Sequence, residues 1–408
     1  MPDISKGRSP FYPGQPVPVE LFVGRAEQIR RIMEHGVGQV AAGKPVAMFV
    51  QGEYGIGKSS IAGVVQRLAE NGHGLHSIYA PLGGARTLED VAAAVLEATL
   101  RSGAFDVSKS DRVRNWLARY IGQQHLFGFT LNATALKQDA PQIANPFRML
   151  DFLAEVKKRL ADFGVKGVFL VLDEINGVTR NPDFAHFIKG LVDTNAMSPQ
   201  PLPLLLMLCG VEERRREMIE AHRPVDRIFE VVAIDPMPAD EVAQFFQRAF
   251  ESVQMTVDAN ALRPLVHYSA GFPKIMHLLG DAAYWLDEDG LVSQEDAFAA
   301  VFMAAEEVGK KYVDQQVYSA LRSADYRSIL DKIAAIGPDE LGFRKAQIQA
   351  GLTHSQKLKL NNFLQKMKQL KVLRSGEARG EYVFTSRMVR LYIWLNSTRP
   401  RGETPSPA

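Results

Sequence analysis

Residues Met48–Ala62 read MFVQGEYGIGKSSIA, an apolar run followed by a glycine loop, a Lys-Ser pair and the start of a helical pattern. Gly52, four further residues, Gly57, Lys58 and Ser59 match the spacing G-x-x-x-x-G-K-[ST] of the phosphate-binding P-loop. Glycines permit the tight turn that points successive N–H groups at phosphate oxygens, and a helix start adds its positive dipole end. A glycine-rich turn without a ligand is the alternative, but the strand-like and helical flanks favour a P-loop.

The P-loop pattern predicts a role for each residue of the loop. Lys58 is expected to reach the β- and γ-phosphates, and the Ser59 hydroxyl is expected to ligate Mg2+. ATP and Mg2+ are therefore the predicted cofactors. The predicted nucleotide-binding residues of this loop are Gly52, Glu53, Tyr54, Gly55, Ile56, Gly57, Lys58, Ser59 and Ser60.

A later apolar run ends in two acidic residues. Gly167–Glu174 reads GVFLVLDE, and a continuous apolar run is typical of a central parallel strand covered on both faces. Asp173 is expected to hold Mg2+ through its water shell, and Glu174 to polarise the attacking water as general base. A chance acidic pair at a strand end is the alternative. The preceding P-loop favours the interpretation as a Walker B strand.

Composition and cysteine usage limit the class of protein. The chain has 408 residues, enough for two or three domains, and is 46% hydrophobic and 23% charged, as globular proteins are. Its one cysteine, Cys209, excludes an intramolecular disulfide and suits a reducing compartment. The first ten residues lack the apolar core of a signal peptide, and the longest apolar run is far shorter than the ~20 residues of a membrane span. These features predict a cytoplasmic protein with no membrane contact.

Charge is unevenly distributed along the chain. Residues 322–408 hold sixteen Lys and Arg against seven Asp and Glu, a balance of +9, although the whole chain carries only +2. A basic segment on a nearly neutral protein favours an anionic partner. An ordinary solvated, lysine-rich surface explains the same count.

The segment ahead of the P-loop carries a resemblance to a known family. Leu21-Phe22-Val23-Gly24-Arg25 and the helix expected after it resemble the AAA+ ATPases. The resemblance is strongest to the clade that holds initiator-type (origin-recognition-like) proteins and the STAND signalling ATPases. It implies that Phe22, Val23 and Gly24 pack on the adenine. A β-turn with core anchors is the alternative.

The resemblance also implies roles for residues after the Walker B strand. The run Pro203–Gly210 corresponds to the sensor-1 strand, but it ends in Cys209 and Gly210 where the family usually has a polar residue. Ala270–Lys274 reads AGFPK and resembles the Gly-x-Pro lid motif, which implies Pro273 near the adenine and Lys274 as sensor 2. A helix-breaking turn is the alternative for this motif.

Two arginines before the last strand are candidates for an arginine finger. The family places such a residue in this region, where it faces the nucleotide of the next subunit, and Arg223 and Arg227 occupy matching positions. The resemblance therefore implies a homo-oligomer with nucleotide at its subunit interfaces. Surface or structural salt bridges explain isolated arginines equally well.

The C-terminal part has the element order of a winged helix: a helix, a helix-turn-helix and a two-stranded hairpin. In its long helix, from His354 to Leu370, we expect Leu358, Phe363, Leu364, Met367 and Leu370 to face inward. His354, Gln356, Lys357, Lys359, Lys366 and Lys368 are expected to face outward, where amides and cations suit bases and phosphates. The predicted contacts to double-stranded DNA are His354, Gln356, Lys357, Lys359, Arg374 and Arg379. Contacts to a protein partner remain the alternative.

These motifs together predict an α/β fold: a parallel-sheet P-loop (AAA+) core, an all-helical lid domain and a C-terminal winged-helix domain. The expected segments are an extended arm at 1–20, the ATPase core at 21–238, the lid at 239–321, the winged helix at 322–396 and a disordered tail at 397–408. Residues 101–146 are expected to be less regular, with one or two strands at 125–134.

Three classes of function fit the sequence. In the first, ATP–Mg2+ binding and hydrolysis form a switch that controls assembly and DNA engagement through the winged helix. In the second, a signalling ATPase contacts a separate effector protein through its lid and winged helix, as in phage-defence modules. The third is an ordinary motor enzyme that works on protein or nucleic acid.

Overall fold

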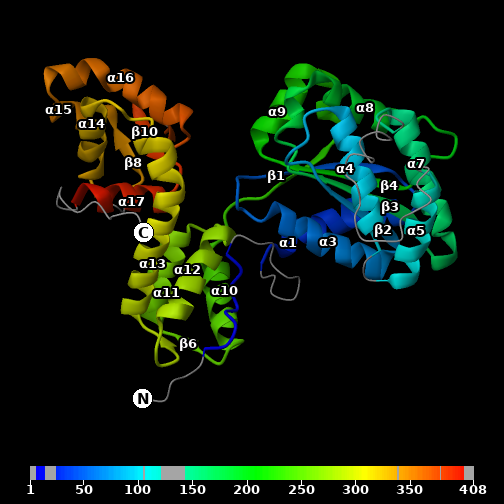
Figure 1. The fold of residues 1–408 in the computed structure, drawn as a ribbon, viewed down its shortest axis with the longest axis horizontal. Helices are drawn as coiled ribbons and strands as arrows, with labels where there is room; N and C mark the ends of the chain where they lie inside the picture. Colours follow the sequence, from blue (N-terminus) through cyan, green and yellow to red (C-terminus); the bar gives the residue numbers. More distant parts are fainter. Residues whose placement is uncertain are drawn as a thin grey trace. The chain divides into compact units, whose positions relative to one another are not determined.

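The computed structural model describes residues 6–13, 24–103, 106–120, 143–337, 340–376 and 378–398. The chain divides into two compact units (Figure 1). Pro16–Pro236 forms the sheet unit, and Met1–Gln15 with Met237–Ala408 forms the helical unit. Phe22, Val23 and the strands expected at 125–134 lie outside the described residues.

The sheet unit alternates strands and helices. Its principal elements are α1 (Ala26–Ile32), η2 (Met33–Val37), α2 (Gly38–Ala41), β1 (Val46–Gln51), α3 (Lys58–His73), β2 (Leu75–Pro81), α4 (Leu88–Arg101), α5 (Val107–Tyr120), α7 (Pro146–Arg159), β3 (Gly167–Asp173), α8 (Pro182–Ala196), β4 (Leu204–Gly210), α9 (Glu212–Ala221), η6 (Arg223–Ile228) and β5 (Glu230–Ala233). A capping box opens α4, in which Thr87 and Asp90 exchange side-chain-to-backbone hydrogen bonds.

The five strands form one parallel sheet in the order β2-β3-β4-β1-β5. All seven residues of β3 and of β4 are buried, as the unbroken apolar runs predict for central strands. Alternate strand residues such as Phe49, Leu170 and Leu206 share a core with α4, α5, α7 and α8. On the opposite face, Met48 and Leu205 pack against Gly36 of η2. The carboxyl ends of β1 and β3 therefore meet at one edge, on either side of β4.

Helix α5 is a difference from the sequence-based expectation of a less regular stretch. Val113, Trp116 and Leu117 are buried and recur at the i, i+3, i+4 spacing of one helix face. The Trp116 ring lies 5.5 Å from the ring of Phe152 on α7. Most other residues of the helix are polar or charged, so its short apolar stripe was a weak signal in the sequence.

The helical unit begins with a segment in which helices predominate and continues with a segment that mixes helices and short strands. Its elements are α10 (Ala239–Glu251), β6 (Thr256–Val257), α11 (Ala259–Ser269), α12 (Pro273–Leu286), β7 (Leu291–Val292), α13 (Gln294–Val308), η7 (Gly309–Tyr318), α14 (Ala324–Ala334), β8 (Gly342–Arg344), α15 (Lys345–Ala350), α16 (His354–Gln369), β9 (Leu373–Ser375), β10 (Glu381–Phe384) and α17 (Arg387–Thr398). The short strands β6 and β7 pair within a stretch that the sequence suggested was wholly helical.

Residues 6–13 of the expected arm pack on α10 and α12. Phe11 is buried, and its ring lies 5.0 Å from the ring of Phe250. A side chain at Gly280 would overlap the Phe11 ring, so the ring needs the space that this glycine leaves. The backbone N–H of Tyr12 donates to Nδ1 of His277 at 3.2 Å. The N-terminal segment is thus part of the core of the helical unit.

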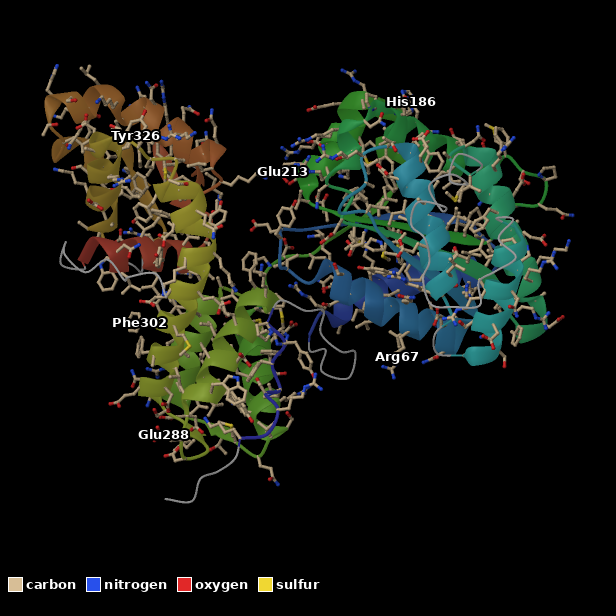
Figure 2. All side chains as sticks on the ribbon, in the orientation of Figure 1. Arg67, His186, Glu213, Glu288, Phe302 and Tyr326 are labelled. Atoms are coloured by element: carbon tan, nitrogen blue, oxygen red, sulfur yellow. The ribbon has the colours of Figure 1, made fainter. Side chains whose placement is uncertain are left out.

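The C-terminal part of the helical unit has its own apolar core. Strands β8, β10 and β9 form an antiparallel sheet, and α14 and α16 pack together beside it. Tyr326 on α14 (Figure 2) lies 5.6 Å, ring to ring, from Phe363 on α16. Arg390 is buried, and its guanidinium donates to the carbonyl oxygens of Ala334 and Gly337.

Two expectations for α16 are wrong. Gln356 is buried. Its side-chain carbonyl accepts from the Thr353 N–H in a capping box, and its amide donates to Ser328 Oγ at 2.9 Å. Leu358 is 71% exposed instead of facing inward. The buried stripe is Leu360, Phe363, Leu364 and Met367, at the spacing i, i+3, i+4, i+7, and Leu358 lies off that face.

None of the helices in the described part of the chain has the length and hydropathy that crossing a bilayer requires.

The stability of the N-terminal segment on the helical unit should depend on pH. Burial lowers the pKa of His277 to about 4 from its ordinary value of 6.5. Because the folded pKa lies below the unfolded one, the stabilisation is complete above pH 6.5 and is lost as pH falls toward 4. The loss at pH 5 is about 2 kcal/mol. Hydrogen exchange of residues 6–13 and of α12 should accelerate between pH 7 and pH 5, after correction for intrinsic exchange.

The matched variant is His277→Asn, which keeps a hydrogen-bond acceptor near Tyr12 but does not titrate. Its corrected exchange rates should vary less with pH than those of the wild type. Equal pH dependence in the two proteins would contradict this assignment.

Candidate functional site

The loop between β1 and α3 is shaped by close contacts with its neighbours. Gly57 has φ of 100° and is the N-cap of α3, a left-handed conformation that favours glycine. A Cβ at Gly52 would lie 2.7 Å from the carbonyl oxygen of Ile234, so the loop passes the end of β5 too closely for a side chain. The Gly52 N–H donates to the Gly210 carbonyl at the end of β4, at 3.2 Å. The loop therefore lies at the carboxyl edge of the sheet.

The Lys58 side chain lies back over this loop. Its ammonium donates to the carbonyl oxygens of Gly52 at 2.9 Å and Glu53 at 2.8 Å. It also lies 5.7 Å from the centre of the exposed Tyr54 ring. Burial lowers the pKa of Lys58, and the Asp173 charge partly opposes that shift. A lysine ammonium has three donors, so one remains for a phosphate oxygen.

Ser59 and Asp173 meet at the start of α3. Ser59 Oγ donates to Asp173 Oδ2 at 2.5 Å, and Asp173 is only 2% exposed. The backbone N–H of Glu174 donates to Asp173 Oδ1 at 2.8 Å. Mg2+ in nucleotide sites is held by one or two protein oxygens, by phosphates and by water. The Ser59 hydroxyl and the Asp173 carboxylate fit this donor set of Mg2+. No group of three His, Cys, Asp or Glu able to hold a metal occurs in the described residues.

Glu174 follows Asp173 in the sequence, but its carboxylate lies near Gly83. It is exposed and has φ of 56°, a left-handed conformation that is uncommon outside glycine. A Cβ at Gly83 would overlap Glu174 Oε2, so the carboxylate approaches the backbone between β2 and α4. The two adjacent acidic residues therefore have different surroundings: Asp173 is buried and hydrogen-bonded, whereas Glu174 is accessible to solvent.

Cys209 and four predicted site residues belong to other elements, namely β4, η6 and α12. Cys209 is buried in β4, and burial raises the pKa of its thiol, which keeps it neutral. Arg223 and Arg227 lie on η6 and are both exposed, without an ion pair within the part of the chain that the structure describes. In the helical unit, Pro273 is the first residue of α12 and Lys274 follows it on the surface.

The predicted DNA contacts lie on the C-terminal part of the helical unit. Five of them are exposed: His354, Lys357, Lys359, Arg374 and Arg379. Lys359 pairs with Asp325 of α14 at 2.6 Å. Gln356 does not belong to this surface, because it is buried and forms the capping box described above.

Two residues beside the P-loop were not singled out from the sequence. Arg25 is 5% exposed and donates to the carbonyl oxygens of Ile56 in the loop and Asp235 after β5. Its only sequence signal was its place in the Gly-Arg pair ahead of α1. The Tyr79 hydroxyl on β2 donates to Asp173 Oδ2, and nothing in the sequence of that strand pointed to this contact.

Comparisons with known proteins agree with this geometry. Residues 21–219 match the family model of the AAA ATPase domain. The search of curated proteins gave no match. The structure is similar to the Walker-type ATPase paby2304 of Pyrococcus abyssi, with 18% identity and a TM-score of 0.56, over 92% of this chain and 96% of that one.

It is also similar to the ORC2 protein of Aeropyrum pernix, solved as ADPNP–ADP complexes, with 12% identity and a TM-score of 0.56. The match covers 95% of this chain and 94% of that one. At such identities the likeness concerns the fold. The family match, the five-stranded parallel sheet and the P-loop geometry agree: residues 21–219 are similar to an AAA ATPase domain.

Proposed function

We propose that this protein is a slow, ATP-hydrolysing switch of the initiator or STAND type, whose nucleotide state controls its assembly and its engagement of double-stranded DNA. The observation that carries the proposal is the convergence of Lys58, Ser59 and Asp173 at the carboxyl edge of the sheet. Open parallel sheets bind their ligands at this edge, at the point where the strand order of the sheet reverses. The solved ORC2 protein of Aeropyrum pernix is described as a complex with ADPNP and ADP, which supports nucleotide as the ligand.

In the proposed complex, the loop amides and Lys58 hold the triphosphate. Ser59 would ligate Mg2+ and Asp173 would hold it through water, and the bound ion would supply positive charge beside the phosphates. Gly24, with Phe22 and Val23, is proposed to contact the adenine. The remaining loop residues, Glu53, Tyr54, Ile56 and Ser60, contribute backbone groups.

Hydrolysis is assigned to Glu174 as general base. Its exposure supports this role, because a water molecule can reach a carboxylate that is not enclosed. Arg223 and Arg227 are proposed to reach the nucleotide of a neighbouring copy in a homo-oligomer. Their exposure, with no ion pair inside the described chain, supports that proposal, since a finger must be free to contact another subunit.

Removing the Lys58 ammonium should abolish the response of the protein to nucleotide. With ATP and Mg2+ at 100 times the dissociation constant, binding stabilises the wild type by about 2.7 kcal/mol. The melting temperature of wild type should therefore rise by several degrees, and that of Lys58→Ala should not change. Lys44→Ala, which removes an exposed lysine of the same unit, is the control and should behave as wild type. If ATP and Mg2+ raise the melting temperature of Lys58→Ala as much as that of wild type, the P-loop does not bind the nucleotide.

Replacing the proposed base should separate binding from hydrolysis. Glu174→Gln should retain the ATP affinity of the wild type and lower the steady-state hydrolysis rate by about 100-fold or more. Glu213→Gln, on α9 at the surface (Figure 2), is the matched control and should hydrolyse ATP normally. Phosphate release and equilibrium nucleotide binding are measured for all three proteins. Normal turnover in Glu174→Gln would show that another group activates water.

The C-terminal part of the helical unit is proposed to act as a winged helix on DNA. In this proposal the helix α15, the turn at residues 351–353 and the helix α16 form the helix-turn-helix, and β9 and β10 form the wing. His354, Lys357 and Lys359 project from α16, and Arg374 and Arg379 belong to the wing. Exposed cations on these elements suit phosphate contacts beside a recognition helix.

The salt dependence of duplex binding tests this surface in the full-length protein. Each phosphate contact contributes about −0.9 to the slope of log affinity against log salt. Lys357→Ala should therefore weaken binding and make the slope shallower by about 0.9. Lys158→Ala, an exposed lysine of the sheet unit, should leave the slope unchanged. A wild-type slope near zero would exclude phosphate contacts.

A protein partner is the second candidate for this surface, and one observation favours it. Leu358 is 71% exposed on α16 between Lys357 and Lys359. A large apolar side chain at the centre of a polar, charged surface is typical of protein interfaces. In that case Leu358→Ala would weaken binding of a separate effector protein, and the duplex measurement would show no slope.

A further inference from the structure

The carboxylate of Asp173 accepts more hydrogen bonds than the P-loop and the Walker B residues donate to it. Ser59 Oγ donates to Oδ2 and the Glu174 N–H donates to Oδ1. The third donor is the Tyr79 hydroxyl, which reaches the same oxygen as Ser59. Tyr79 lies on β2, opposite Val171 in the register with β3. The contact thus joins the edge strand β2 to the last residue of β3.

The three donors leave little freedom to the carboxylate. A carboxylate offers about four lone-pair positions, two on each oxygen. Ser59 and Tyr79 occupy the two positions of Oδ2, and the Glu174 N–H occupies one position of Oδ1. One position of Oδ1 remains for a further donor. A water molecule bound to a metal is such a donor, and it would meet a carboxylate whose orientation is already fixed.

We propose that Tyr79 is a positioning residue for magnesium: its hydroxyl fixes the rotation of the Asp173 carboxylate so that the free lone pair of Oδ1 receives a metal-bound water. This inference rests on the proposed nucleotide site and adds to it a residue of β2. Partners that hydrogen-bond to metal-site carboxylates hold them in the binding geometry, and their loss costs about 10–100-fold in metal affinity. Tyr79 touches neither nucleotide nor water in this assignment and acts only through Asp173.

The test compares nucleotide binding with and without magnesium. Tyr79→Phe removes one oxygen atom and keeps the ring that packs on the sheet. The dissociation constant of a non-hydrolysable ATP analogue is measured for the full-length protein in Mg2+ and in EDTA. The expected result is about 10-fold weaker binding in Mg2+ and unchanged binding in EDTA. Tyr312→Phe, which removes a hydroxyl that donates to the Leu370 carbonyl in the helical unit, should change neither value.

A double-mutant cycle checks that the effect passes through Asp173. In an Asp173→Asn background, Tyr79→Phe should cause no further loss in Mg2+, because the carboxylate that it positions is gone. Equal weakening in Mg2+ and in EDTA would overturn the proposal, since it would mean that Tyr79 supports the loop in general. Unchanged binding in both conditions would also overturn it.

The wild type distinguishes this inference from the proposed function. If wild type binds the analogue with no dependence on Lys58, the P-loop assignment fails and the role of Tyr79 fails with it. If wild-type binding requires Lys58 and strengthens with Mg2+, but Tyr79→Phe behaves as wild type, only the positioning role is wrong.

Discussion

The hydrogen bond between Ser59 and Asp173 connects the two motifs on which the site depends. Ser59 is the second residue of the helix that follows β1, and Asp173 is the last residue of β3, which β4 separates from β1 in the sheet. These groups are 114 positions apart in the sequence. Only the parallel order of the strands brings their carboxyl ends to one edge, so the sheet topology is the physical condition for a site that could hold a phosphate and a metal.

Much of this arrangement could be predicted from the sequence because it depends on strong local patterns. The apolar runs of β3 and β4 require burial on both faces, which excludes an exposed sheet. The glycines and Lys58 of the loop have few structural explanations other than a phosphate-binding turn. The sequence therefore predicted these strands from their apolar runs, and the phosphate-binding loop from its glycines and Lys58. The roles of individual residues toward a nucleotide or a neighbouring copy rest on the family resemblance and remain predictions.

Other features depend on contacts that local patterns do not encode. Tyr79 lies in an ordinary apolar strand, and only the pairing of β2 with β3 brings its hydroxyl to Asp173. Gln356 was expected on the surface because it is polar, although its spacing from Thr353 matches a capping box and could have revealed its burial. Leu358 was assigned inward by hydrophobicity alone, whereas the stripe that begins at Leu360 excludes it from the buried face.

The most direct measurement of the central claim is a crystal structure of the full-length protein with a non-hydrolysable ATP analogue and Mg2+. The account predicts the triphosphate on the amides of the loop from Gly52 to Ser59, with Lys58 on its outer phosphates. It also predicts Mg2+ between the Ser59 hydroxyl and a water held by Asp173. A nucleotide bound elsewhere, with this loop empty, would contradict the account.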